Sequence, residues 1–205
     1  MRETSKAMTR RMSEDPQFWN AIFHGFGIDV GSGNDPLQLP HNVVHFNLPD
    51  GGGDRLTDFF GGYVDLSYDT KRLGRLHVAG FDFIHGSQVL EHAENPYHML
   101  NSWVEMLRRG GFIIATVPDF TLYEKNSWPS RWNKGHRSTW SMDKTISPCP
   151  IHIKLPEWFE RFPVSVTRCK LIDTNYDYSA ERGIDQTFNP TKNVECFVEF
   201  VLQKK

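Results

Sequence analysis

A strand, a helix and a second strand follow one another between residues 80 and 117, and this order limits the fold more than any other feature. Residues 80–85 and 112–117 are apolar runs of strand length, and the second is of the kind buried on both faces of a sheet. Between them, residues 95–109 have helical spacing. The apolar residues on one face of that helix are Leu100, Trp103, Val104 and Leu107. Such a unit connects parallel strands, so an α/β protein with a parallel sheet is expected.

Further strands are expected on both sides of this unit. Residues 26–30 and 42–47 are short apolar runs that end in turns rich in glycine or polar residues. Residues 194–202 form a long alternating run near the C-terminus. Only about ten residues separate Gly33 from Val43, too few for a helix with its two connections. The first helical region of the sheet is therefore expected to be shortened.

The N-terminal part is expected to differ from the rest. Residues 1–12 are polar, and we expect them to be mobile. A short helix is then predicted, with Asp15 as its cap and Pro16 in its first turn. We interpret residues 1–25 as an N-terminal helical segment and residues 26–205 as a single domain.

The sharpest local signal is a glycine turn that follows the first strand, where residues 27–36 read GIDVGSGNDP. Glycine lets the backbone bend sharply and approach a ligand, and ligands of open α/β sheets bind beyond the carboxyl ends of the strands. A nicotinamide-binding fingerprint is not matched. It needs a third glycine, which is missing after Gly33, and an acid at the end of the second strand, where Asn47 stands. No GKS or GKT follows, which excludes a P-loop. Alone, the pattern leaves open whether residues 31–33 bind a ligand or only turn the chain.

A second pattern follows in the same chain. The sequence reads FDFIHGSQVLEH at residues 81–92, LRRGGF at residues 107–112 and ATVPD at residues 115–119. Together with the glycine turn, this run resembles the class I S-adenosylmethionine-dependent methyltransferases, in particular the type 11 group, although Arg109 stands where that group usually has proline. The resemblance covers residues 26–119. It implies a Rossmann-like, doubly wound, mostly parallel sheet with an antiparallel C-terminal strand, and S-adenosylmethionine as the cofactor.

The resemblance also implies a cofactor site at the ends of the strands. The glycine turn would hold the methionine carboxylate or lie beside the ribose, and Asp29 would help to fix the amino group. Asn47 or Asp50 would bind the ribose hydroxyls, although both residue types are also common in turns. Asp65 and Leu66 would contact the adenine, unless they belong to an exposed loop. The full set of cofactor-binding candidates is Asp29, Gly31, Ser32, Gly33, Asn47, Asp50, Asp65, Leu66, Ser87 and Gln88.

Three residues are catalytic candidates. Methyl transfer needs a general base only when the acceptor loses a proton, and histidine suits that role near neutral pH. His92 follows the strand at residues 80–85, where it could face the acceptor or cap the next helix. His136 could act as the base or be a structural histidine, and Asp119 lies at the tip of a strand. Glu91 beside His92 suggests a metal, but adjacent strand residues point in opposite directions, so no metal site is predicted.

Residues 120–150 are expected to form an aromatic lid or acceptor insertion. The segment combines several rings with basic residues, a mixture that can stack on bases or sugars. The rings are Tyr123, Trp128, Trp132 and Trp140. A lid packed over the core, with a small polar molecule beneath it, is the favoured interpretation.

Composition narrows the function further. With 23 basic and 25 acidic residues, the chain lacks the positive charge of a protein that binds nucleic acid mainly through phosphates. The three cysteines form no zinc or disulfide pattern, and no apolar run has the length of a membrane span, so a cytoplasmic protein is expected. The predicted function is methyl transfer to oxygen or nitrogen of a small molecule or glycan. A methyltransferase-like binding module that has lost activity is the alternative, and Asn47 and the short first connection favour it.

Overall fold

The computed structural model describes residues 3–40, 43–47, 59–60, 80–143, 145–181, 183–189 and 191–205. The cofactor candidates Asp50, Asp65 and Leu66 lie outside the described residues, as does the side chain of Asn47. No described helix combines the length and the apolar composition that are needed to cross a membrane.

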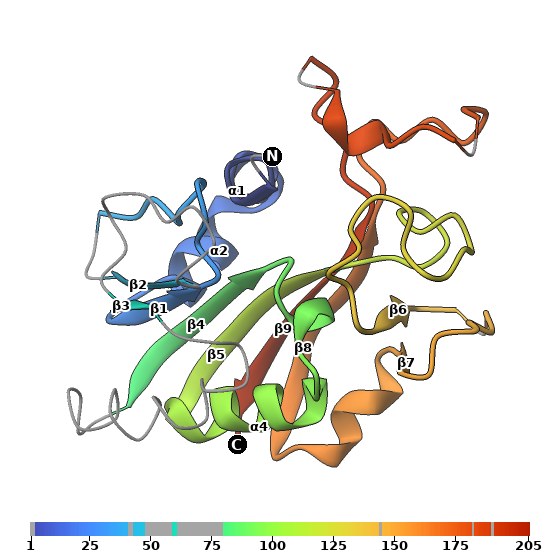
Figure 1. Ribbon diagram of the computed structural model, residues 1–205. Helices are drawn as coiled ribbons and strands as arrows, with labels where there is room; N and C mark the ends of the chain where they lie inside the picture. The colour runs from blue at the N-terminus through green and yellow to red at the C-terminus, as the bar shows by residue number, and fades with distance from the viewer. Residues whose placement is uncertain are drawn as a thin grey trace.

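A seven-stranded sheet with the order β3-β2-β1-β4-β5-β9-β8 forms the centre of the protein (Figure 1). Its strands are β1 (Gly27–Val30), β2 (Val43–Asn47), β3 (Phe59–Phe60), β4 (Phe81–Ser87), β5 (Leu107–Pro118), β8 (Val164–Ile172) and β9 (Phe197–Lys204). The first five strands pair in parallel, whereas β9 runs antiparallel to both of its neighbours. This arrangement confirms the expected doubly wound, mostly parallel sheet with an antiparallel C-terminal strand.

Apolar side chains cover both faces of the sheet, because successive residues of a strand point to opposite sides. On one face, α2 (Pro16–Ile22) packs through Trp19 against Phe83 and Ile114. On the other face, α4 (Pro96–Met106) packs through Trp103 against a cluster that includes Ile84. The sheet is thus buried on both sides, as its continuous apolar strands predict.

Shorter elements complete the fold. A separate two-stranded parallel sheet consists of β6 and β7, and the described parts of the connections contain three 3₁₀-helices. The bounds are β6 (Thr139–Ser141), β7 (His152–Lys154), η1 (Leu90–His92), η2 (Glu157–Arg161) and η3 (Gln186–Phe188). Residues 34–40, between β1 and β2, contain no helix, which confirms the shortened first connection.

The mobile N-terminus was a wrong prediction. Residues Glu3–Glu14 form helix α1, which ends just before α2 begins. Arg11 is fully buried, and its Nε atom lies 2.8 Å from Glu199 Oε2 on strand β9. Arg10 adds a second bond to Glu199, at 2.6 Å. Charged residues that look solvent-exposed in the sequence therefore attach this helix to the sheet.

The helix expected at residues 95–109 is shorter than predicted, and the following strand is longer. The Asn95 side chain caps α4 and Pro96 lies in its first turn. The helix ends at Met106 because Leu107 already has extended backbone angles and pairs with Phe81. The Arg108 side chain forms an ion pair with Asp82, which also holds the segment against β4.

Candidate functional site

A cavity of about 270 Å³ lies where the carboxyl ends of β1 and β4 meet. Its wall combines the glycine turn after β1 with the segment that follows β4, the two regions that the sequence patterns single out. Further wall residues come from the segment after β5 and from α1. The lining residues that concern the chemistry are Gly31, Ser32, Gly33, Ser87, Gln88, Glu91, His92, Tyr123, Asn133 and His136.

The glycine turn has the backbone conformation that its sequence predicts. Gly31 and Gly33 have φ angles of 70° and 51°, in the left-handed region that favours glycine. The Gly31 amide donates to the carbonyl of Phe46 on β2 at 2.7 Å, which fixes the start of the turn. The Ser32 hydroxyl is buried and has no hydrogen-bond partner among the described residues. An unpaired buried hydroxyl in a cavity wall is a site that a polar ligand group would satisfy.

Asp29 is buried beside the turn and is bonded within the protein. Its Oδ1 atom lies 2.7 Å from His85 Nδ1, and its Oδ2 atom accepts from the Leu37 amide at 2.7 Å. Burial would raise the pKa of Asp29, but hydrogen bonds from His45 and His85 outweigh it and lower the pKa. Asp29 does not line the cavity, so its structural role is to hold the β1 end and the 34–37 link in place. Its predicted contact with the cofactor stays a prediction.

Ser87, the last residue of β4, and Gln88, which follows it, both line the cavity. The hydroxyl oxygens of Ser87 and Thr116 are 3.2 Å apart, and the Gln88 amide donates to the same Thr116 oxygen at 3.2 Å. Gln88 has a φ angle of 57°, which is unusual for a residue with a side chain. The bonds to β5 therefore hold a sharp bend in the cavity wall.

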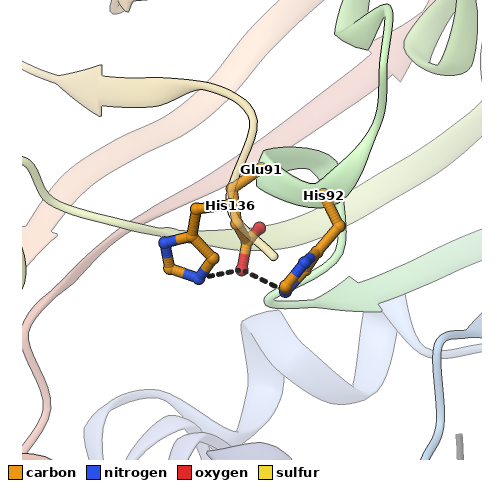
Figure 2. A group of neighbouring side chains, drawn as sticks. All are labelled: Glu91, His92 and His136. Carbon is orange, nitrogen blue, oxygen red and sulfur yellow. Dashed lines mark ion pairs between the residues drawn. The ribbon is translucent and has the colours of Figure 1, made fainter. Parts of the chain in front are cut away.

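Glu91, His92 and His136 converge on one point of the same wall. Figure 2 shows the Glu91 carboxylate between the two imidazole rings, with His136 reaching it from the loop after β5. Glu91 Oε1 lies 3.8 Å from His92 Nε2 and 3.9 Å from His136 Nε2. Glu91 and His92 lie on the 3₁₀-helix η1, not on a strand, so the strand alternation invoked for this pair does not apply. For that reason, the convergence of the three side chains was not predicted from the sequence.

The two histidines are oriented by bonds at their other ring nitrogen. His136 Nδ1 lies 2.6 Å from the buried Glu124 carboxylate, and His92 Nδ1 lies 3.1 Å from the Gly135 carbonyl oxygen. Both partners accept hydrogen bonds, so each Nδ1 carries the proton when the ring is neutral. Each Nε2 then presents a lone pair on the side of Glu91. Glu124 gave no signal in the sequence, because it lies 12 residues from its partner.

The protein environment shifts the protonation of this group strongly. Burial raises the pKa of Glu91 to about 7, and the charge of His136 only partly opposes it. Burial lowers the pKa of His92 to about 4, and the nearby His136 adds to the effect. Shifts of this size cluster at functional sites.

Asp119, the third catalytic candidate, does not line the cavity. Its Oδ1 atom accepts from the amides of Thr121 and Leu122 and from the Thr121 hydroxyl, which fixes the turn after β5. The structure therefore gives Asp119 a structural role. Its catalytic role remains a prediction without a contact to support it.

The aromatic residues of the 120–150 segment lie in different surroundings, and the lid stays a prediction. Tyr123 lines the cavity, and its ring lies 5.6 Å from that of His136. Trp140 is instead fully buried on β6, where it packs edge-on against Trp158. Trp132 donates from its ring nitrogen to the Tyr123 carbonyl at 3.1 Å, which supports the loop from outside.

Helix α1 covers the opposite side of the cavity. Glu3 and Thr4 are part of its wall, and the Ser5 amide donates to Asp35 of the glycine turn at 2.8 Å. A larger groove, of about 790 Å³, runs along α1 and the 174–195 segment. It contains none of the predicted site residues, so the smaller cavity is the candidate site.

No protein-family model matches the sequence, and no curated protein matches it. Solved structures do match along almost the whole chain. An S-adenosylmethionine-dependent methyltransferase from Anabaena variabilis aligns with a TM-score of 0.58 at 10% identity, over 99% of this chain and 86% of that chain. A Thermotoga maritima protein, described as a possible histamine N-methyltransferase, gives 0.57 at 16% identity, over 100% and 93%. A Haloferax volcanii complex of a methyltransferase with the Trm112 activator gives 0.51 at 14%, over 98% and 92%. At these identities the likeness establishes the fold.

Proposed function

We propose that this chain, which has the fold of the class I S-adenosylmethionine-dependent methyltransferases, transfers a methyl group to oxygen or nitrogen of a small molecule or glycan. One observation supports the proposal most. The Gly31–Ser32–Gly33 turn and the Glu91–His92–His136 group form the wall of one cavity, so a cofactor and an acceptor could meet there.

The described part of the cavity fits the methionine end of the cofactor. Gly31 and Gly33 expose bare backbone, and the unpaired Ser32 hydroxyl offers a hydrogen bond to a carboxylate or hydroxyl. Ser87 and Gln88 bring further polar groups to the same wall. These residues would hold the methionine portion. Contacts from Asn47, Asp50, Asp65 and Leu66 to the ribose and adenine remain predictions.

The cofactor supplies a methyl group on a cationic sulfur that is already a good leaving group. The protein then has to hold the two partners in line and keep water away. Residues Glu3 and Thr4 of α1 close one side of the cavity, which helps to exclude water. His136 lines the cavity and its Nδ1 is bound to Glu124, an arrangement that suits a proton acceptor at Nε2.

The acceptor class rests on the size and polarity of the cavity. Its polar end, formed by Glu91, His92 and Asn133, favours an acceptor with hydroxyl or amino groups. The near-balanced charge of the chain speaks against a nucleic-acid acceptor. The Thermotoga maritima neighbour, described as a possible histamine N-methyltransferase, is consistent with a small acceptor. The three free cysteines support a reducing compartment, such as the cytoplasm.

The test is transfer of labelled methyl groups from S-adenosylmethionine to a panel of small alcohols, amines and oligosaccharides. We expect label to appear in at least one class of acceptor, and His136→Ala to lower the rate while cofactor affinity is retained. The exposed residue His98 provides the control variant His98→Ala, which should transfer at the wild-type rate. Cofactor binding without transfer to any acceptor would favour the alternative, an inactive binding module.

A further inference from the structure

We propose that Glu91, His92 and His136 form a binding site for one divalent transition-metal ion in the wall of the cavity. The three side chains come from two segments far apart in the sequence, η1 after β4 and the loop after β5. Each residue offers one donor atom, and the three donor atoms lie within 4.8 Å of one another. This reverses the expectation from the sequence that the chain has no metal site.

The geometry needs only small movements to hold an ion. Metal–nitrogen and metal–oxygen bonds are about 2.0–2.2 Å long. Glu91 Oε1 now lies 3.8 Å from His92 Nε2 and 3.9 Å from His136 Nε2, so these donor atoms must move slightly closer together to share one ion. The Asn133 amide nitrogen lies 3.4 Å from His92 Nε2 and would have to move away before an ion could bind to this nitrogen. Asn133 and His92 are only partly buried, so their side chains have room to rotate, whereas Glu91 and His136 are buried.

The orientation of both histidines is typical of metal ligands. A ligating histidine usually donates its other ring N–H to a carboxylate or a backbone carbonyl, which fixes the tautomer and turns the free nitrogen toward the ion. His136 is bound in this way to Glu124, and His92 to the Gly135 carbonyl. Both Nε2 atoms are thereby directed at the same carboxylate.

Glu91 supplies an independent observation. Its side chain is fully buried, and neither carboxylate oxygen has a hydrogen-bond partner among the described residues. A buried carboxylate is normally paired, hydrogen-bonded or bound to a metal. Among the described residues, its ion-pair partners are the two histidines, at distances longer than a hydrogen bond. A cation between these three groups would satisfy the carboxylate.

The donor set selects the class of ion. Two imidazoles and one carboxylate suit Mn²⁺, Fe²⁺, Co²⁺ or Zn²⁺, whereas Mg²⁺ and Ca²⁺ prefer oxygen ligands alone. Three protein ligands leave further coordination positions, and these face the cavity. An ion at this site would occupy the Nε2 lone pair of His136, so with metal bound His136 would act as a ligand and not as the proton acceptor. If the proposed methyl transfer is correct, on which this last step rests, the open positions favour an acceptor that binds through oxygen.

The test is a titration of chelator-treated protein with Co²⁺, followed by visible absorption and calorimetry. We expect one equivalent to bind with a visible absorption band, and Glu91→Gln to weaken the affinity about 10-fold or more. His136→Asn is the second variant, in case one substitution disturbs folding, and circular dichroism checks that each variant is folded. His98→Ala, at an exposed histidine of α4, is the matched control and should bind like the wild type.

Two results would overturn the metal site. The first is no binding of Co²⁺ by the folded wild type. The second is that Glu91→Gln and His136→Asn both bind Co²⁺ with the affinity of the wild type. A purely proton-transferring role of the three residues would give the first result. Parallel titration with S-adenosylhomocysteine separates this inference from the proposed function. Binding of S-adenosylhomocysteine without metal binding defeats the metal site alone, and metal binding without binding of S-adenosylhomocysteine defeats the methyltransferase alone.

Discussion

A substitution at Ser32 can test a contact with the cofactor without disturbing the fold. A substitution at Gly31 would not serve, because a side chain there would meet Val89 Cγ2 at 2.4 Å and adopt a strained backbone. The Ser32 hydroxyl, in contrast, is buried without a partner among the described residues. Removing it costs the free protein no hydrogen bond, while a bound ligand would lose one.

We therefore expect Ser32→Ala to weaken the binding of S-adenosylhomocysteine about fivefold, which corresponds to about 1 kcal/mol. The free energy of unfolding should stay equal or rise slightly. Calorimetry and urea unfolding measure the two effects. Unchanged affinity together with lower stability would mean that Ser32 is only a structural residue.

Individual residues of the site differ in whether their positions could be predicted from the sequence. The glycines at 31 and 33 were predictable, because a left-handed turn after a strand favours that residue type. The convergence of Glu91 and His92 was not, because it depends on η1 being a 3₁₀-helix. The partner of His136, Glu124, depends on the path of an irregular loop that no periodicity describes.

At the scale of elements, α1 is joined to the sheet by charged groups. Glu199 on β9 accepts from Arg10, Arg11 and Arg168, with distances from 2.6 to 3.0 Å. Burial alone would raise the pKa of Glu199, but Arg11 and Arg10 outweigh it and hold the pKa at about 2. The ionised carboxylate is therefore more stable in the folded chain than in the unfolded one.

This shift makes the stability of the protein sensitive to acid. The folded pKa lies below the ordinary value of 4.5, so the ionised Glu199 stabilises the fold above that pH and loses this effect as the pH falls toward 2. We expect Glu199→Gln to lower the free energy of unfolding by roughly 3 kcal/mol at pH 7, and the difference from the wild type to shrink between pH 4.5 and 2.

Urea unfolding at several pH values measures this difference. Glu94→Gln, at an exposed residue, is the control and should show little change at any pH. A difference that stays constant from pH 7 down to pH 2.5 would mean that the ionisation of Glu199 does not stabilise the fold.

The elements themselves were predictable to different degrees. The strands that became β1, β4 and β5 are continuous apolar runs, and burial on both faces requires that pattern. Helix α1 was missed because its buried surface includes arginine, whose partner lies almost 190 residues away. The end of α4 was placed too late because pairing of Leu107 with Phe81 overrides the helical spacing.

At the scale of the whole molecule, the sheet topology assembles the cavity. The parallel order of β1, β4 and β5 places the glycine turn, η1 and the loop with His136 at the same edge. Sequence patterns predicted that edge, because ligands of open α/β sheets bind there. They could not predict that α1 closes the cavity, since that contact joins Ser5 to Asp35 across the fold.

The most direct measurement is isothermal calorimetry of the purified full-length chain with S-adenosylhomocysteine, the demethylated form of the cofactor. We expect one molecule to bind per chain, with a dissociation constant well below 1 mM. Adenosine alone should bind more weakly, because it lacks the amino-acid portion that the Gly31–Gly33 turn and Ser32 would hold. A folded protein that shows no binding of S-adenosylhomocysteine, or binds adenosine equally well, would contradict a methyltransferase site in this cavity.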